Sequence, residues 1–585
     1  MSSAPQNAAP TAVSAVREVE MKLHLDPRDL SRVADLPALK EKAEGAPAVR
    51  DLRTVYYDTP DRRLFLGGVA LRVRQDGDRF VQTLKTINAA TPGDSAAVAI
   101  RKKWDWTIPT AAPDMTPLDA EGVAALVPEN ARAALVPQFT TEFRRTTLLV
   151  RPDALTSIEV AVDDGQITAG NACARISEVE LELKSGRIGR LFDIALTLQR
   201  RVPVRIGTES KAEIGDRLVT GRLPAPVLPE PLGLTPVTTV AEAYRHILRH
   251  GLRLLLANEA CALAGGDVEG LHQMRVALRR LRTAIRLFRP LAGAPDACRA
   301  GNDIRWFSRQ LGPARDWDVL LSHGIMPFAA TEKAPADGIA ALTAAVREAR
   351  RAPALAAVEA IQSPRCTGLI LALGAWLEDG AWQSGAAPEV RAQLDRPMAE
   401  LSGPWLAAQH AKALRAGALK AGRDLDGADA AARDRLRRRL RKLRHTAEFF
   451  RGLYAETATV PFIAALDALL GALDAEHDAA VAGDRLRGLS ADRPGSGPLP
   501  KGPPAGSPSR PTSAARHCRG CGRRSATSRC SGDGLAPTLA LPRFAHVRGQ
   551  PRRWIATDYT AIDTPATALR SHRCAGSPPR RSCQT

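Results

Sequence analysis

Charged and apolar residues alternate in the stretch Glu18-Val19-Glu20-Met21-Lys22. In a β-strand, successive side chains point to opposite faces, so the two carboxylates and the ammonium share one face while Val19 and Met21 share the other. A strand with this charged face cannot pack an ordinary dry core, because unpaired buried charges are costly. The stretch therefore predicts a strand whose charged face lines an interior filled with water, cations and a polyanion.

The same alternation recurs in five later segments, some of them basic and some acidic. They are Leu71–Arg74, Gln82–Lys85, Arg101–Trp106, Glu159–Asp163 and Glu178–Lys184. One strand of this kind is typical of a solvated face on an antiparallel sheet. Six of them, sorted by charge, instead favour a small closed β-barrel that encloses one ligand.

Five motifs between residues 17 and 220 resemble the CYTH family, the triphosphate tunnel metalloenzymes, in their order and spacing. They are Glu18-x-Glu20-x-Lys22, Tyr56-Tyr57-Asp58-Thr59-Pro60, Leu71-Arg72-Val73-Arg74, Glu178-Val179-Glu180-Leu181-Glu182-Leu183-Lys184 and Ser210-Lys211-Ala212-Glu213. The resemblance implies an eight-stranded antiparallel β-barrel whose tunnel binds a triphosphate with Mg²⁺ or Mn²⁺.

Two residues depart from the pattern of that family. Lys103 stands where relatives often carry a glutamate, and Glu142 is an acid in the strand that supplies Arg145. We expect both residues to alter the number of bound metal ions or the choice of substrate.

The charged residues of the predicted tunnel take roles that follow from their chemistry. Carboxylates hold hard divalent cations, while ammonium and guanidinium groups neutralise phosphate oxygens. The predicted metal ligands are Glu18, Glu20, Glu180 and Glu182. The predicted substrate-binding residues are Lys22, Arg72, Arg74, Lys85, Arg101, Arg145, Lys184 and Lys211. The predicted catalytic residues are Lys22 and, as groups that orient the attacking water, Glu159 and Asp163.

From about Val240 the sequence changes to long Ala-, Leu- and Arg-rich segments with a helical period. Between Leu271 and Pro290 an apolar stripe and a basic stripe run along one predicted helix. The basic stripe returns 162 residues later, with Asp434 at the position of His272. A repeat of this length predicts two duplicated helical bundles that turn their basic stripes toward each other.

The segments His272–Arg282 and Leu311–Asp318 resemble the CHAD family, and this resemblance spans about residues 238–485. It implies an all-α domain with a basic groove that binds inorganic polyphosphate. The predicted polyphosphate-binding residues are His272, Arg275, Arg279, Arg282, Arg286, Arg437, Arg441 and Arg444. Relatives usually carry a histidine at the position of Asp434. A carboxylate there repels phosphate, so we expect a weakened affinity.

The sequence thus predicts an α+β multidomain chain. Its parts are a leader (1–16), the barrel (17–220), a Pro-rich linker (221–237), the helical domain (238–485) and a disordered tail (486–585). The tail is rich in Pro, Gly, Ser and Arg, and its sudden change of composition is what a shifted reading frame would produce. Cys518 and Cys521 form half of a zinc-binding pattern without a convincing second half.

The formal net charge of +19 lies mostly in that tail. From Ala491 to Thr585 there are 16 Lys and Arg against four Asp, a net of +12, which leaves +7 for the rest of the chain. This mild balance argues against a general nucleic-acid partner. We also expect no membrane-spanning segment, because no run of eighteen apolar residues occurs. Scattered single cysteines suit a reducing compartment, so we expect a cytoplasmic protein that can associate with polyphosphate granules.

The sequence therefore predicts a hydrolase that acts on inorganic triphosphate and carries a polyphosphate-binding domain. Two alternatives use the same tunnel as an enzyme, either as a class IV-type adenylate cyclase or as a thiamine triphosphatase. A third alternative is a non-catalytic, granule-associated polyphosphate-binding protein. The four predicted metal ligands argue against this last one, because binding a polyanion has no use for carboxylates.

Overall fold

The computed structural model describes residues 16–87, 95–120, 122–265, 267–293, 295–330, 336–417 and 430–491. The predictions for the leader up to residue 15, and for the tail after Ala491 with its cysteines and shifted reading frame, lie outside the described residues. The first strand already includes Val16, and the last helix runs past residue 485 to Ala491. Both folded parts are thus slightly longer than their predicted limits.

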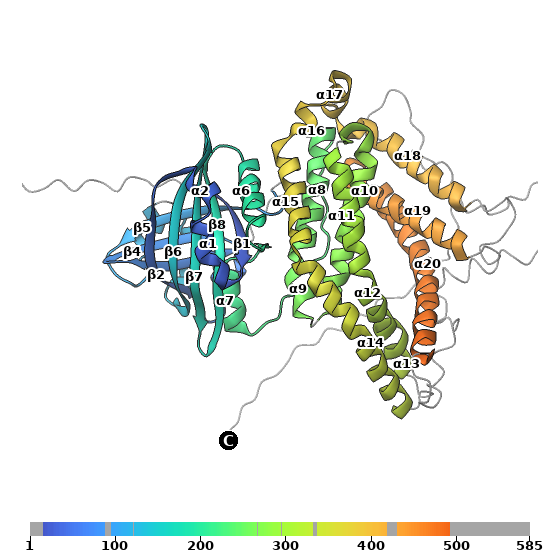
Figure 1. Ribbon diagram of the computed structural model, residues 1–585, viewed down its shortest axis with the longest axis horizontal. Coiled ribbons are helices and arrows are strands. Elements are labelled where there is room, and N and C mark those ends of the chain that lie inside the picture. The colour runs from blue at the N-terminus through green and yellow to red at the C-terminus, as the bar shows by residue number, and fades with distance from the viewer. Residues whose placement is uncertain are drawn as a thin grey trace, which may run out of the picture. The chain divides into compact units, whose positions relative to one another are not determined.

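Eight antiparallel strands close into a barrel, as the sequence predicts (Figure 1). They are β1 (Val16–Leu25), β2 (Ala43–Asp58), β3 (Val69–Asp76), β4 (Arg79–Thr86), β5 (Ala99–Ile108), β6 (Val136–Asp153), β7 (Thr156–Ala169) and β8 (Ala172–Ser185). The strand order is β5-β4-β3-β2-β6-β7-β8-β1, and pairing between β1 and β5 closes the ring. A short strand, β9 (Val204–Gly207), extends this edge by pairing with the second half of β1.

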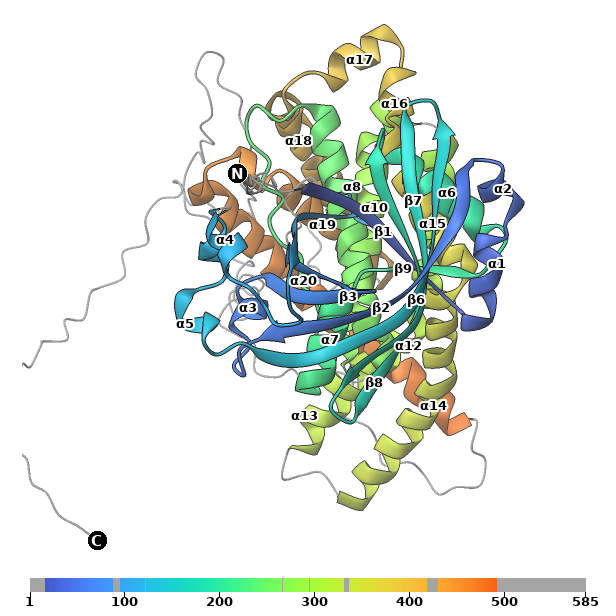
Figure 2. The ribbon, with the colours of Figure 1, turned by 90° about the vertical axis from the view of Figure 1, so that its left-hand side faces the viewer.

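A large apolar cluster lies on the outside of the barrel. Trp104 and Trp106 of β5, together with Leu84 of β4, are buried under short helices rather than inside the ring. Those helices contribute Leu118 and Ala131 to the same cluster. The helices concerned are α3 (Arg63–Leu66), α4 (Thr116–Ala120) and α5 (Glu129–Arg132), which gather on one side of the barrel in Figure 2. This outer cluster explains how the strands can turn their charged faces inward.

One end of the barrel interior is apolar. Phe139 and Phe143 of β6 and Ile167 of β7 form a buried cluster on the inward face. Helix α7 (Lys211–Thr220) contributes Ala212 to this cluster and packs Ile214 against it. The interior is therefore filled at this end, while the charged residues occupy the remainder. The other helices next to the barrel strands are α1 (Leu30–Ala34), α2 (Pro37–Lys40) and α6 (Gly189–Gln199).

The C-terminal part of the described chain is helical and repeats itself. Three helices, α8 (Val240–Ala257), α10 (Val268–Ala292) and α11 (Pro295–Gln310), recur as α18 (Met398–Gly417), α19 (Ala430–Phe449) and α20 (Glu456–Ala491). Between them lie α9 (Glu259–Ala264), α12 (Gly312–Val319), α13 (Met326–Ala329), α14 (Ala336–Gln362), α15 (Pro364–Asp379), α16 (Ala381–Ser384) and α17 (Pro388–Leu394). The predicted duplicated helical domain is therefore present.

The two repeats meet where α10 and α19 cross. Thr283 Oγ1 of α10 lies 3.4 Å from His445 Nδ1 of α19, and these two residues are 162 positions apart. Since 162 is also the repeat length, equivalent positions of the two repeats touch each other. Such a contact marks a local two-fold relationship between α10 and α19.

Helix α20 is, among the described residues, the one helix long and apolar enough to cross a membrane by length and composition. Its most apolar 18-residue window has a mean hydropathy of 1.5 and is 28% buried. The same helix packs against α19, and its Asp467 and Asp474 form ion pairs with arginines of α19. These contacts are those of a helix that packs within the helical domain.

Candidate active site

The charged residues predicted for the tunnel line one cavity inside the barrel. Every predicted metal ligand and every predicted substrate-binding residue lies on its wall, and so does Glu159. The cavity has a volume of about 180 Å³, which is room for roughly six water molecules. Of the predicted site residues in the barrel, only Asp163 does not reach this wall. It is fully buried behind it.

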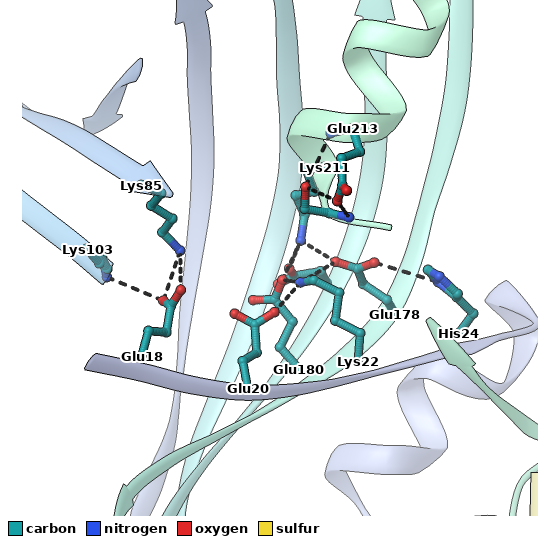
Figure 3. Close-up of polar contacts among 12 residues, drawn as sticks. Glu18, Glu20, Lys22, His24, Lys85, Lys103, Glu178, Glu180, Lys211 and Glu213 are labelled. Atoms are coloured by element: carbon teal, nitrogen blue, oxygen red, sulfur yellow. Dashed lines mark hydrogen bonds and ion pairs between the residues drawn. The ribbon is translucent and has the colours of Figure 1, made fainter. Parts of the chain in front are cut away.

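One group of charges surrounds Lys211 and Lys22 (Figure 3). Lys211 Nζ lies 2.7 Å from Asp163 and 2.9 Å from Glu180, and it also donates to Glu178. Lys22 lies 2.5 Å from Glu20 and pairs with Glu180. Burial alone would lower the pKa of Lys22, but Glu178, Glu180 and Glu20 outweigh it and raise that pKa well above its usual value. This group holds its lysines charged.

Arg145 belongs to the same group. It donates to Asp163 from two nitrogens, at 2.7 and 2.6 Å, and it also pairs with Glu180. Burial favours a neutral Glu180, yet Lys211, Lys22 and Arg145 together hold its pKa well below the usual range. Asp163 is thus a structural counter-ion for Arg145 and Lys211. Its predicted role in orienting water does not fit a carboxylate that is 0% exposed.

A second group of charges is centred on Glu18. Lys85 Nζ lies 2.9 and 2.8 Å from the two oxygens of Glu18, and Lys103 lies 3.8 Å from the same carboxylate. Burial opposes ionisation, but the two lysines lower the pKa of Glu18 to about 2. Lys103, which the sequence singled out as a departure, therefore does lie in the tunnel (Figure 3).

A third part of the cavity wall carries cations that form no ion pair with other described residues. Arg72 donates to the Tyr56 hydroxyl at 3.2 Å and Arg74 to Thr54 at 3.3 Å. Neither these two residues nor Arg101 forms an ion pair within the described part of the chain. Burial and the nearby charges of Arg72 and Arg145 lower the pKa of Arg74 to about 9. Positive charge that lacks a carboxylate partner makes this wall suited to an anion.

Strand register places three carboxylates in a row across the sheet. Glu159 of β7 is opposite Glu182 of β8, and Glu182 is opposite Glu20 of β1. Lys184 lies 2.8 Å from Glu182 and 3.6 Å from Glu159, and it is 38% exposed. Like charges directly opposite one another are unfavourable unless a cation lies between them. Lys184 and Lys22 pair with these carboxylates, so a divalent cation would take the place of ammonium groups here. The row contains two of the predicted metal ligands and offers the oxygen donors that a hard divalent cation prefers.

A tighter carboxylate cluster lies deeper in the barrel but is already neutralised. Ligand atoms of Asp163, Glu178 and Glu180 lie within 4.8 Å of one another. The Lys211 ammonium pairs with all three, so it occupies the position that a metal ion would take. The sequence missed Glu178 as a member of this cluster, although its place in the acidic alternation was the available signal.

Glu142, the other departure from the family pattern, is outside the tunnel. Its side chain is 55% exposed and lies 3.1 Å from Arg53 on the outer surface of the barrel. Glu142 and Arg145 are three positions apart, an odd number, so the two side chains point to opposite faces of β6. The expectation that Glu142 alters metal number or substrate choice at the site is therefore wrong.

The motif from Tyr56 to Pro60 holds the helices that position Lys211. Asp58 accepts hydrogen bonds from the backbone N–H groups of Leu64 and Phe65, both at 2.9 Å, and thereby caps α3. Just before α3, Arg62 has a φ of 63° and pairs through two hydrogen bonds, at 2.6 and 2.7 Å, with Asp216 of α7. The motif thus fixes the helix whose first residue is Lys211.

In the helical domain, the predicted polyphosphate-binding residues fall into two sets. His272, Arg275, Arg279, Arg282 and Arg286 lie on α10, and none of them forms an ion pair among the described residues. Burial together with Arg315, Arg279, Arg275 and Arg441 lowers the pKa of His272 to about 3, so this histidine is neutral at pH 7. Arg437, Arg441 and Arg444 of α19, in contrast, are all paired with carboxylates.

Comparisons with known proteins agree with both resemblances. Residues 16–214 match the family model of the CYTH domain, and residues 246–487 match that of the CHAD domain. An inorganic triphosphatase of Haemophilus influenzae is 35% identical over 166 residues, which are 28% of this chain and 45% of that protein. The chain thus spans less than half of the length of this curated relative.

Two solved structures are also similar. The CHAD domain of the plant Ricinus communis is 35% identical, with a TM-score of 0.40, over 46% of this chain and 86% of that one. A Hippeastrum protein, described as a candidate adenylyl cyclase with a dominant triphosphatase activity, is 19% identical, with a TM-score of 0.27, over 35% of this chain and 97% of that one. By its two family matches, this chain belongs to the proteins that join an N-terminal CYTH domain to a CHAD domain.

Proposed function

We propose that the barrel hydrolyses inorganic triphosphate with the help of Mg²⁺ or Mn²⁺, and that the helical domain binds inorganic polyphosphate. One observation carries the first part. The same cavity is lined by guanidinium groups that form no ion pair among the described residues and by a row of three carboxylates. A polyphosphate with a bound divalent cation is the ligand that uses both sets of side chains at once.

The basic residues of the cavity bind the substrate in this proposal. Arg72, Arg74 and Arg101 bind phosphate oxygens, because they have no ion pair with another described residue to give up. Burial, partly offset by Glu18, lowers the pKa of Lys85 to about 8, so this lysine still carries most of its charge at pH 7. Together they neutralise and orient the triphosphate, which is most of what phosphoryl transfer requires of a protein.

The carboxylate row supports the hydrolytic step. Glu20 and Glu182 would hold the divalent cation, which supplies charge neutralisation and a more acidic water. Glu159, next to Glu182 and 29% exposed, is placed to orient that water. A bond forms between the water oxygen and the terminal phosphorus, while the bond from that phosphorus to the bridging oxygen breaks. The products are orthophosphate and diphosphate.

The test of the enzyme proposal is phosphate release by the full chain. We expect orthophosphate from triphosphate with Mg²⁺ or Mn²⁺, and none after EDTA removes the metal. ATP and thiamine triphosphate serve as parallel substrates that would reveal the cyclase-like or thiamine triphosphatase alternatives. If triphosphate with either metal yields no phosphate while the protein binds it, the tunnel is a binding module and the enzyme proposal fails.

The binding proposal for the helical domain has its own measurement. We expect fluorescently labelled long-chain polyphosphate to bind the full chain, and we expect its affinity to fall steeply between 50 and about 500 mM KCl, because salt screens interactions between exposed charges. A short phosphate such as diphosphate should compete poorly, since it spans few of the arginines. Binding that does not respond to salt would contradict an electrostatic groove.

A further inference from the structure

We infer that polyphosphate binds on the first helical repeat only, because the second repeat neutralises its own basic stripe. This inference rests on the proposed binding function and assigns it to one surface. We call that surface the first-repeat track and define it by Arg275, Arg279, Arg282 and Arg286 of α10 with Arg305 and Arg309 of α11.

The basic stripe of the second repeat is occupied by carboxylates of the same chain. Arg437 lies 2.8 Å from Asp434 and 3.0 Å from Asp474, and Arg441 also pairs with Asp474. Arg444 lies 3.0 Å from Glu448 and also pairs with Asp467. Asp434, expected to repel phosphate, thus acts mainly by holding arginines. An incoming polyanion would have to displace each of these partners.

The first repeat lacks these two acids of α20 at the matching positions. Moving back 162 residues from Asp467 leads to Arg305, and from Asp474 to Gly312. Arg282 of α10 therefore has Arg305 and Arg309 of α11 as neighbours, where its repeat equivalent Arg444 pairs with Asp467 of α20. Burial, followed by the charges of Arg286, Arg305 and Arg309, lowers the pKa of Arg282, which is the mark of cations that repel one another.

Buried nitrogen atoms also support the inference that the first repeat binds the polyanion. Arg275 Nη1, Arg279 Nε and Arg282 Nε are buried without a hydrogen-bond partner in the described part of the chain. Asp316 and Asp478 attract Arg275, and Asp474 attracts Arg279, but none of these acids forms an ion pair with the track arginines among the described residues. Buried donors are normally satisfied, so three on one helix face indicate a missing acceptor. An anion that reaches along α10 would supply it.

The contacts across the local two-fold relationship show the same asymmetry. Arg280 pairs with Glu448 across the crossing of α10 and α19. The repeat equivalent of Arg280 is Lys442, and that of Glu448 is Arg286. The equivalent contact therefore joins Lys442 and Arg286, which are both positively charged. Burial and then Arg286 lower the pKa of Lys442 to about 8. One cross-repeat contact is closed by an internal ion pair, and its counterpart is open to an external anion.

The track suits a linear phosphate chain rather than a nucleic acid. From Arg275 to Arg286 the helix rises about 16 Å, so a chain that lies along it meets several guanidinium groups in succession. Sequence-tolerant binding of single-stranded nucleic acids uses exposed aromatic rings for base stacking. Trp306, which lies between Arg305 and Arg309 in sequence, has its ring covered by Arg365 at 4.3 Å.

A pair of equivalent substitutions tests the inference in the full chain. We expect Arg282→Gln to weaken binding of long-chain polyphosphate about tenfold at low salt, and its repeat equivalent Arg444→Gln to change it less than twofold. Thermal unfolding verifies that both variants are folded. Equal losses in the two variants, with the wild type binding, would overturn the inference and leave the binding function standing. A wild type that does not bind would end both.

A second measurement avoids the folding of variants altogether. Phenylglyoxal modifies accessible arginines, and mass spectrometry reads out each site in the wild-type chain with and without polyphosphate. We expect polyphosphate to protect Arg282 and Arg286 and to leave the modification of Arg437 and Arg444 unchanged. Protection of both repeats to the same degree would show that the chain uses both stripes.

Discussion

Glu20→Gln should lower kcat/KM for triphosphate at least 100-fold while the barrel stays folded. Glu20 is opposite Glu182 in the carboxylate row, so the substitution removes charge from the proposed metal site. Loss of a group that merely supports a metal ligand already costs 10- to 100-fold, and a direct ligand should cost no less. Glutamine has the same shape as glutamate, and Lys22 keeps its pairing with Glu180, so no cavity and no unpaired lysine results.

Two further measurements make this result specific. Calorimetric titration with Mn²⁺ should show weaker metal binding by the Glu20→Gln variant, independent of turnover. Glu142→Gln is the matched control, because it makes the same chemical change on the outer surface of the same barrel, where the side chain is 55% exposed. We expect this control to keep at least half of the wild-type activity. Glu20→Gln with normal Mn²⁺ affinity and normal turnover would exclude the carboxylate row as the metal site.

The local alternation of charged and apolar residues was enough to predict the strands and which face of each strand lines the cavity. Glu18, Glu20 and Lys22 are nearly buried and line the cavity, and Trp104 and Trp106 occupy the other face of their strand. This works because a two-residue period fixes which side chains share a face, whatever the partner strand is. The same alternation excludes Glu142 from the tunnel, because Glu142 and Arg145 point to opposite faces of their strand. The wrong expectation for Glu142 came from comparing whole strands with the family and not from the alternation of the residues.

Register between distant strands was not available from the sequence. The row of Glu159, Glu182 and Glu20 arises only when β7, β8 and β1 pair as they do. Alternation alone cannot tell that Glu182 rather than Glu178 lies beside Glu159. It also cannot tell that Asp163 is sealed behind the wall. These relations depend on where strands begin to pair, which turns and bulges decide.

The helical domain shows a related gap. The 162-residue match of the basic stripes correctly brought α10 and α19 together. It said nothing of the acids on α20, because Asp467 and Asp474 lie on the next helix and outside the compared stripe. Whether an arginine is free for a ligand depends on the charge of the facing helix. A prediction based on one stripe at a time therefore treats both repeats as equivalent.

Lys211→Met should lower the free energy of unfolding of the protein by about 3–5 kcal/mol at pH 7, the usual cost of removing one partner from a buried ion pair. Lys211 is 6% exposed and pairs with Asp163, Glu178 and Glu180, whose ligand atoms lie within 4.8 Å of one another. Without the ammonium, Lys22 and Arg145 must compensate the whole cluster. Methionine has a similar length, so the loss reflects charge rather than a cavity.

The pH dependence separates this cause from a packing defect. In the wild type, the pKa of Glu180 and that of Asp163 lie below their usual values, so both carboxylates stabilise the fold above the unfolded pKa of about 4, and that contribution is lost at lower pH. In Lys211→Met, burial and mutual repulsion raise these pKa values, so the same groups destabilise the fold at pH 7 and are relieved on protonation. The difference in unfolding free energy between the two proteins should therefore shrink as the pH falls from 7 toward 4.

Urea unfolding at several pH values measures this difference directly. Lys184→Met is the matched control, because Lys184 lies in the same tunnel and pairs with Glu182 at 2.8 Å, yet it is 38% exposed. Solvent screens such a pair, so its loss should cost less than about 1 kcal/mol at every pH. A loss in Lys211→Met that is independent of pH, or no larger than that of Lys184→Met, would contradict the role of Lys211 as the internal cation of this cluster. It would also remove the reason why the three carboxylates can lie together in the absence of a metal ion.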